Sequence, residues 1–278
     1  MTIERRKFFK GAAASLLGLG LAGGAYPFLE ARWCRVTRVR VPLRNLPAAF
    51  EGTTLAHLTD IHHGPNVSIE YVRHVVDMTN ALKPDLVMLT GDFVHRGHPH
   101  IEPVAGELAR LRAGMGKFAV LGNHDHWGNP ADMRAALVSA GVTLAENRGE
   151  WIERGCNRLR VAGVGDLWED RQDPASALGD ADEGDATILM SHNPDYAEYL
   201  TDRRVGLMLS GHTHGGQIRV PGYGAPILPS RFGQKYAQGL VEGPACPVYV
   251  SRGVGTAGPP ARFFCRPEVV HITLTSSA

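Results

Sequence analysis

Short runs of apolar and β-branched residues recur along the chain, and each stops abruptly at polar side chains. Five such runs cover residues 53–59, 86–89, 117–120, 187–190 and 207–209. A continuous apolar run of this length is typical of a strand that is buried on both faces. The pattern therefore predicts a core of short buried strands, each ending in polar groups.

Helical periodicity fills the gaps between the first three runs. Residues 69–82 carry apolar side chains at helical spacing, and Ser68 in front of them can cap that helix. Further helices are predicted over residues 101–111 and 129–140, the last one stopped by Gly141. Strand and helix thus alternate with a repeat of about 30 residues, the size of a strand-helix-strand unit.

The remaining segments predict more strands and one long loop. Residues 170–184 are acidic and are expected to form a surface loop or a short helix, and residues 215–234 are rich in Gly and Pro and are expected to form a long loop. Alternation and short apolar runs predict further strands within residues 32–50, 151–153, 159–164, 248–250 and 269–274, the second and third as an antiparallel pair.

Charge is distributed unevenly along the chain. The formal net charge is only +1, but nine Lys and Arg residues precede Asn45 together with two Glu residues, which leaves 20 basic and 26 acidic residues in the remainder. A globular part with an acidic excess gains nothing from the counterion release that drives non-specific nucleic-acid binding. No nucleic-acid partner is expected, whereas cations could be held.

The amino-terminal residues 1–31 are expected to be a targeting segment. Arg5-Arg6-Lys7 precedes an apolar stretch from Gly11 to Leu29, an order that resembles a twin-arginine export signal, although Glu4 stands where Ser or Thr is usual. We expect the export machinery as a partner and an extracytoplasmic or membrane-anchored location. The stretch is long enough to remain as an anchor, and a buried helix is the alternative. Residues 32–52 would then form a leading strand and linker, and residues 53–278 the main domain.

The four cysteines provide no metal-binding pair. Cys34, Cys156, Cys246 and Cys265 show no Cys-x-x-Cys spacing. Buried free thiols are expected, and a disulfide with any of three pairings remains the alternative for an exported protein.

Metal-ligating side chains follow the five apolar runs. The carboxyl ends of strands in such sheets lie along one edge, so these side chains are expected to converge. Carboxylate, imidazole and amide oxygen without thiolate suit Mn, Fe or Zn. A carboxylate between two ligand groups would bridge two metals, and Asp92 fits that position. The candidates are Asp60 and His62, Asp92, Asn123 with His124, His192, and His212 with His214.

From Thr53 to its end, the chain resembles the calcineurin-like metallophosphoesterases. It is most similar to a bacterial subgroup with an export leader or anchor, also through Gly215-Gly216-Gln217 and Pro267-Glu268. The resemblance implies an α/β (α+β) fold, a four-layer αββα sandwich of two mixed sheets. It rests on five ordered blocks: Asp60-x-His62, Gly91-Asp92, Gly122-Asn123-His124-Asp125, His192 and Gly211-His212-Thr213-His214.

The same resemblance implies the roles of these residues. His124 would be catalytic, acting on the leaving oxygen, and Asp125 would orient it. Two divalent ions would present a hydroxide for in-line attack on a phosphate ester. One ion would be held by Asp60, His62, Asp92 and His214, and the other by Asp92, Asn123, His192 and His212.

The predicted function is hydrolysis of a phosphoester, with a phosphodiester or pyrophosphate favoured. A nucleotide-diphosphate lipid is an alternative substrate, and a non-catalytic metal-binding or interaction domain is the alternative function. Histidines of the loop after Asp92, including His95, are expected to be solvated. Asp166 is left out of the metal site. Side chains that could contact phosphate are Arg219, Lys235, Tyr236 and Arg252, and His126 and Trp127 could form a pocket wall.

Overall fold

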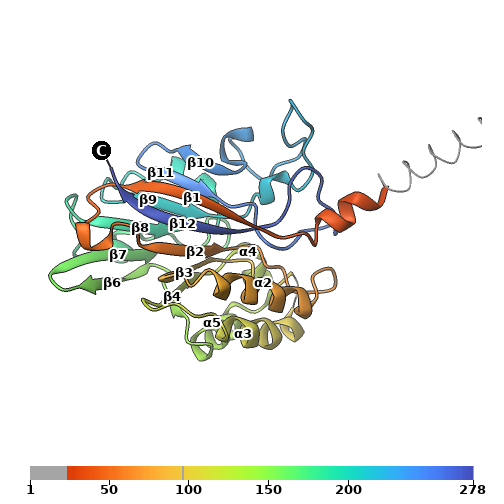
Figure 1. Cartoon of the computed structure of the whole chain (residues 1–278), viewed down its shortest axis with the longest axis horizontal. Helices are drawn as coiled ribbons and strands as arrows, with labels where there is room; N and C mark the ends of the chain where they lie inside the picture. Colours follow the sequence, from red (N-terminus) through yellow and green to blue (C-terminus); the bar gives the residue numbers. More distant parts are fainter. Residues whose placement is uncertain (1–23, 96, 278) are drawn as a thin grey trace, which may run out of the picture.

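Two six-stranded mixed sheets form the centre of the molecule in the computed structural model, which describes residues 24–95 and 97–277 (Figure 1). In the first sheet, β12 runs parallel to β1 and antiparallel to β2, and the β2–β3–β4–β5 part is parallel. The strand order is β1 (Arg35–Leu43), β12 (Glu268–Ser276), β2 (Thr54–Leu58), β3 (Leu86–Thr90), β4 (Lys117–Val120) and β5 (Thr143–Leu144).

The second sheet repeats this mixture of parallel and antiparallel pairs. Its four central strands are parallel, and each edge strand joins them antiparallel. Its order is β10 (Gly239–Glu242), β11 (Pro247–Val250), β9 (Leu207–Ser210), β8 (Ala186–Met190), β7 (Asn157–Gly163) and β6 (Arg148–Arg154). The predicted antiparallel pair is therefore β6 with β7.

Helices cover the outer faces of both sheets. Helices α2 (Ile69–Ala81), α3 (Ile101–Ala109) and α5 (Pro130–Ser139) pack on the first sheet, as Figure 1 shows. The second sheet is covered by short elements, α6 (Pro174–Leu178) and the 3₁₀ turns η3 (Pro194–Glu198) and η5 (Gly233–Tyr236). The predicted fold class, two mixed sheets between helical layers, is confirmed.

Apolar side chains from both sheets meet to form the central core. Leu55 and Met88 of the first sheet lie in one buried cluster with Ile188 and Leu209 of the second. Burial of such side chains contributes about 1.5–3 kcal/mol each. Because the two sheets share this core, the carboxyl ends of their strands are fixed relative to each other.

Local signals in the sequence placed the helices well. Ser68 caps α2 by accepting a hydrogen bond from the Tyr71 backbone N–H, and Asn129 caps α5 through the Asp132 N–H. The central Asn-His-Asp motif begins helix α4 (Asn123–Gly128). The remaining short elements are η1 (Ala48–Phe50), η2 (His98–His100) and η4 (His214–Gly216).

The segment in front of β1 is attached to the domain. Residues 24–30 are helical, and the buried Glu30 carboxylate accepts hydrogen bonds from the backbone N–H groups of Phe264 and Cys265 at 3.1 and 2.6 Å. Strand β1, part of the predicted linker, pairs with β12 along its whole length. The proposed boundaries after residues 31 and 52 stay predictions.

The twin-arginine motif lies in residues 1–23, outside the described residues. Within residues 24–95 and 97–277, no helix combines the length and apolar character needed to cross a bilayer. All four cysteines fall in the described part and carry free thiols, buried at Cys34, Cys246 and Cys265 and exposed at Cys156.

Candidate metal centre

Five strand ends bring the seven predicted ligands together. Asp60 and His62 follow β2, Asp92 follows β3, and Asn123 begins α4 after β4. From the second sheet, His192 follows β8, and His212 and His214 follow β9. All seven side chains are buried.

Three of these residues form one potential ligand group. The Nε2 atoms of His62 and His214 are 3.1 Å apart, and His214 Nε2 is 3.2 Å from Asp60 Oδ1. Two imidazoles and a carboxylate with converging lone pairs can hold a divalent ion.

A second group lies beside the first. His192 Nε2 is 3.3 Å from Asp92 Oδ2 and 3.2 Å from His212 Nδ1. Asp92 Oδ2 is also 3.3 Å from His62 Nε2 in the first group. One carboxylate oxygen is therefore equally close to an imidazole of each group, which is the geometry expected of a bridging ligand.

The donor atoms fit metal ions in their spacing, and one of them lacks a hydrogen-bond partner. Two ligands bound about 2.1 Å from one ion at tetrahedral or octahedral angles lie about 3.0–3.4 Å apart, which matches the measured contacts. The buried Asn123 Oδ1 has no hydrogen-bond partner among the described residues. A buried acceptor without a partner is costly, and a cation would satisfy it.

Neighbouring groups orient the ligand side chains. His192 Nδ1 lies 2.7 Å from the Thr90 carbonyl, so its N–H donates there and Nε2 faces the cluster. The Asp60 carboxylate accepts the Thr59 hydroxyl at 2.9 Å and the His212 backbone N–H at 3.0 Å. Hydrogen bonds from neighbouring strand ends thus fix the side chains of His192 and Asp60.

Burial and charge set opposite protonation states in two adjacent rings. Burial lowers the pKa of His212 to about 3, so this ring is neutral and able to ligate. Burial also opposes the charged form of His192, but the Asp92 carboxylate outweighs it and raises the pKa of His192 well above its usual value. A metal ion binding there would take the place of a proton.

Backbone strain is concentrated at the ligands. Positive φ angles of 50–65° occur at Asp60, His62, Asp92, His212 and His214. Such angles are uncommon outside glycine and cluster at functional sites, where the surrounding structure enforces them.

Glycines let these strand ends approach each other. A Cβ atom on Gly122 would lie 2.3 Å from Asp92 Oδ1, and one on Gly211 would lie 2.3 Å from Asp60 Oδ2. The glycines before Asn123 and His212 therefore have a steric cause.

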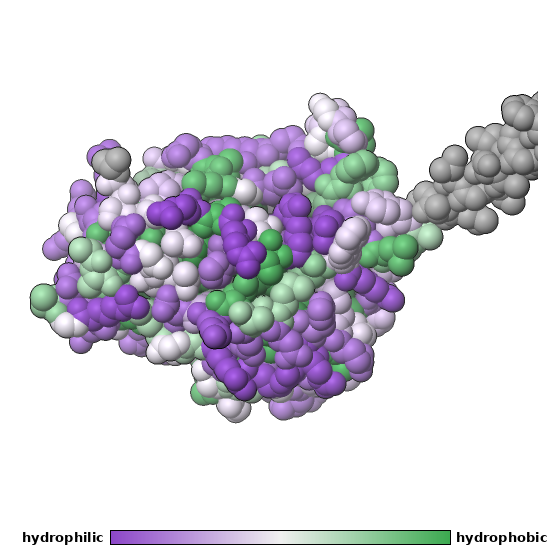
Figure 2. Space-filling view, in the orientation of Figure 1, coloured by the Kyte–Doolittle hydropathy of each residue, from purple (hydrophilic) through white to green (hydrophobic). Residues whose placement is uncertain are grey.

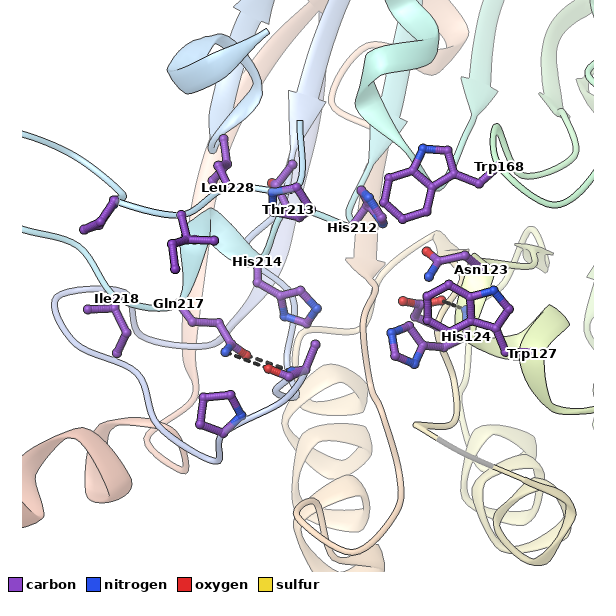
Figure 3. Close-up of a pocket in the computed structure, with 17 residues that line it drawn as sticks. Asn123, His124, Trp127, Trp168, His212, Thr213, His214, Gln217, Ile218 and Leu228 are labelled. Atoms are coloured by element: carbon purple, nitrogen blue, oxygen red, sulfur yellow. Dashed lines mark hydrogen bonds between the residues drawn. The ribbon is translucent and has the colours of Figure 1, made fainter. Parts of the chain in front are cut away.

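His124 lines the same cavity as Asn123 and His212, as seen in Figure 3. Its Nδ1 is 2.9 Å from the His95 carbonyl oxygen, and its ring stacks on the His95 ring at a centroid distance of 5.1 Å. His95 also contacts the His62 ring edge-on at 5.7 Å. His95, expected in a solvated loop, thus belongs to the surroundings of the site.

Asp125 has partners different from those expected. Its carboxylate accepts the backbone N–H groups of Asp92 and Phe93 at 2.8 Å and of Gly122 at 3.0 Å. The expected orientation of His124 by Asp125 is therefore corrected, because the His95 carbonyl holds that ring. Burial and the charge of Asp92 raise the pKa of Asp125 to about 8, and the Gly122 N–H opposes this rise.

Two tryptophans flank the metal ligands. Trp168 meets the His212 ring edge-on at 4.4 Å, and Trp127 lies 4.5 Å from the His124 ring. The buried Asp166 accepts the Trp168 backbone N–H at 2.9 Å and so positions that tryptophan. Trp127 was anticipated as a wall, whereas Trp168 was not.

The four side chains predicted to contact phosphate have other partners. Arg252 forms a buried ion pair with Glu268, and Lys235 pairs with Glu198. The Tyr236 hydroxyl donates to Glu198 at 2.7 Å, and Arg219 donates to the Gly215 carbonyl at 3.0 Å. None of these four side chains lines the cavity that contains His124.

Comparison with known proteins agrees with this geometry. Residues 53–216 match the Metallophos family, described as calcineurin-like phosphoesterase. The chain is 32% identical to the uncharacterized metallophosphoesterase YkuE of Bacillus subtilis, over 99% of each chain. It is 31% identical to the phosphodiesterase YaeI of Escherichia coli, over 98% of this chain and 99% of that protein.

A vertebrate relative has a different overall length. The transmembrane protein with metallophosphoesterase domain of Danio rerio is 30% identical over 94% of this chain and 60% of its own. The ordered strand-end motifs, the two groups of Asp and His side chains and the match over more than half of the sequence lead to one conclusion. The chain belongs to the calcineurin-like phosphoesterases and is a metal-dependent hydrolase of phosphate esters.

Proposed function

We propose that the protein holds two divalent metal ions and hydrolyses a phosphodiester or a pyrophosphate. The observation that carries the proposal is the position of Asp92 Oδ2, 3.3 Å from both His62 Nε2 and His192 Nε2. Asp60, His62, Asp92 and His214 would hold one ion, and Asp92, Asn123, His192 and His212 the other. When bound, the ions would activate water and neutralise charge on the phosphate.

His124 would supply the proton for the leaving group. Its Nδ1 is committed to the His95 carbonyl at 2.9 Å, which leaves Nε2 as the atom able to exchange a proton. The ring is half-buried and lines the cavity, so a substrate can reach it. Asp125 would act through the backbone, because its carboxylate ties the loop of Asp92 to the loop of His124.

Two observations favour a diester: the name of a relative and the charge of the residues that line the cavity. YaeI is named a phosphodiesterase. Among the described residues lining the cavity, no Lys or Arg is present to neutralise the second charge of a phosphomonoester. A diester carries one charge on its phosphate, and a dinucleoside pyrophosphate carries one on each phosphate, so the reacting phosphate of either needs less compensation.

The test is a metal analysis followed by a substrate panel. Protein loaded with Mn, Fe or Zn would be assayed on an aryl phosphomonoester, an aryl phosphodiester and a dinucleoside pyrophosphate. We expect the diester or the pyrophosphate to be hydrolysed with the highest kcat/KM. Inactivity on all three with every metal would contradict the proposal and favour a non-catalytic metal-binding domain.

We also propose export by the twin-arginine route, from the sequence of residues 1–31. A β-lactamase fused after Ala278 would then protect cells against ampicillin, and replacing Arg5 and Arg6 by Lys would remove the protection at unchanged charge. Protection that persists in the Lys variant would contradict this route.

A further inference from the structure

The cavity over the metal centre has a polar end and an apolar end. Its volume is about 600 Å³, within the range of small-molecule sites. Asp92, Asn123 and His212 lie at the polar end. The other end, here called the apolar wall, consists of Ile218, Pro226, Ile227, Leu228 and Pro229 from the long loop after η4. Figure 3 shows Ile218 and Leu228 on the side of the cavity opposite Asn123 and Trp168.

The apolar wall leaves much hydrophobic surface uncovered. Ile227 is 82% exposed and Ile218 is 37% exposed, although both face a cavity that ends at reactive groups. Figure 2 shows further apolar residues at the end of the molecule where the described chain begins. Exposed apolar side chains that line a cavity are typical of a binding site.

Side-chain amides hold this loop in place at both ends. Gln217 donates to the Ala257 carbonyl at 2.9 Å and accepts the Ala257 N–H at 2.8 Å. Gln234 makes the same two-way contact with Ala225, at 2.6 and 3.1 Å. The apolar side chains therefore project from a braced loop, and their exposure is built into it.

Charge at the apolar end restricts what can bind there. Asp92 is the one acidic residue, and Lys and Arg are absent, among the described residues that line the cavity. A second phosphate or a charged head group beside Ile227 would have no counter-charge. An uncharged aliphatic group needs no counter-charge there, and moving its apolar surface out of water is favourable.

We propose that the substrate is a phosphoester with a long aliphatic substituent, and that the apolar wall binds this substituent while the phosphate lies at the metal ligands. The proposal rests on the proposed function, since it uses the same site. It commits to the substrate's own chain as the occupant, because the wall is continuous with Asn123 and His212 in one cavity.

The test is a series of p-nitrophenyl alkyl phosphodiesters from methyl to decyl, each below its micelle concentration. In the wild type, kcat/KM should rise about fourfold for each methylene that becomes buried. The variant Ile227→Asn/Leu228→Asn should lose most of this dependence. The readout is the slope within each protein, so a general loss of activity cancels.

The matched control replaces two exposed apolar residues away from the cavity, Val138→Asn and Leu240→Asn, which are 58% and 44% exposed. This control should keep the wild-type slope. A flat series in the wild type, or an unchanged slope in the Ile227/Leu228 variant, would overturn the inference.

A binding arm separates this inference from the proposed function. Decyl and methyl phosphonates would be titrated into the metal-loaded protein and followed by calorimetry. No hydrolysis of any ester together with tighter binding of the decyl compound would remove the proposed function and keep the apolar site. Hydrolysis of the methyl ester with equal binding of both phosphonates would keep the function and remove the apolar site.

Discussion

The two ends of the cavity are built in opposite ways. At the metal end, ligands such as Asp60 and His192 are buried, come from strand ends and are fixed by short hydrogen bonds. At the apolar end, Ile227 stands on a loop, exposed and without hydrogen-bonding groups in its side chain. The buried strand ends hold the reacting groups in fixed positions, whereas the exposed loop can select among substrates.

The largest expected effect tests the metal end. Replacing His124 by Ala should lower kcat on an aryl phosphodiester by about 10²–10⁴-fold, because proton transfer to the leaving oxygen is lost. Metal content, measured by elemental analysis, should stay at the wild-type level. His74→Ala, on the exposed face of α2, is the matched control. A His124 variant that retains wild-type kcat would remove this residue from the chemistry.

The next effect concerns the buried ion pair between Arg252 and Glu268. Glu268→Gln should reduce the free energy of unfolding by about 3–5 kcal/mol, because it leaves the buried Arg252 without its charge partner. Denaturant unfolding at pH 7 measures this loss. Exposed Glu153→Gln should change stability by less than about 0.5 kcal/mol. Equal stability of the Glu268→Gln and Glu153→Gln variants would show that the Arg252–Glu268 ion pair does not stabilise the fold.

The same pair predicts a pH dependence. Burial favours the neutral carboxyl of Glu268, but its hydrogen bond and ion pair with Arg252 outweigh burial and lower its pKa. A lowered folded-state pKa contributes stability above the unfolded value of about 4.3, and this stability is lost as the pH falls toward the folded pKa. The difference between wild type and Glu268→Gln should therefore shrink below about pH 4.3 in unfolding titrations.

A smaller effect tests the close approach of the strand ends. Gly122→Ala should lower the free energy of unfolding by about 1–3 kcal/mol and reduce metal content, because its Cβ would meet Asp92 Oδ1 at 2.3 Å. Gly106→Ala is the matched control, since nothing lies within 4 Å of its Cβ in α3. The control should gain about 0.5–1 kcal/mol. Similar stability changes in both variants would contradict the steric argument.

The smallest effect falls on the apolar end. Gln217→Ala removes two hydrogen bonds that brace the loop, so KM for a long-chain diester should rise by about three- to tenfold. The kcat value should change little, because the Gln217 side chain bonds Ala257 and the backbone hydrogen bond from Gln217 N–H to the His214 carbonyl does not depend on that side chain. A fall in kcat with constant KM would show that the two ends are not separable.

The metal end could be predicted from sequence because its residues follow apolar runs. Asp60, Asp92 and Asn123 each follow a strand, and parallel strands align their carboxyl ends. The structure brought together all seven predicted ligands for this reason. The presence of a second sheet was predicted from family resemblance alone, because the pairing of β8 with β7 and β9 leaves no short-range signal in the sequence.

Loop residues could not be predicted in the same way. His95 reaches His124 through a backbone carbonyl, and Trp168 reaches His212 because the buried Asp166 caps its N–H. Neither contact depends on periodicity or spacing. The apolar wall is similar, since a Gly- and Pro-rich stretch indicates a loop but not the direction in which Ile227 points.

The central claim is that Asp92 joins two metal positions into one centre. Elemental analysis of purified protein after saturation with Mn or Zn, compared with that of Asp92→Ala and of His212→Ala, tests it most directly. We expect two ions per chain in the wild type, fewer than one in Asp92→Ala and about one in His212→Ala. A single ion per chain in the wild type that survives Asp92→Ala would contradict the dinuclear centre.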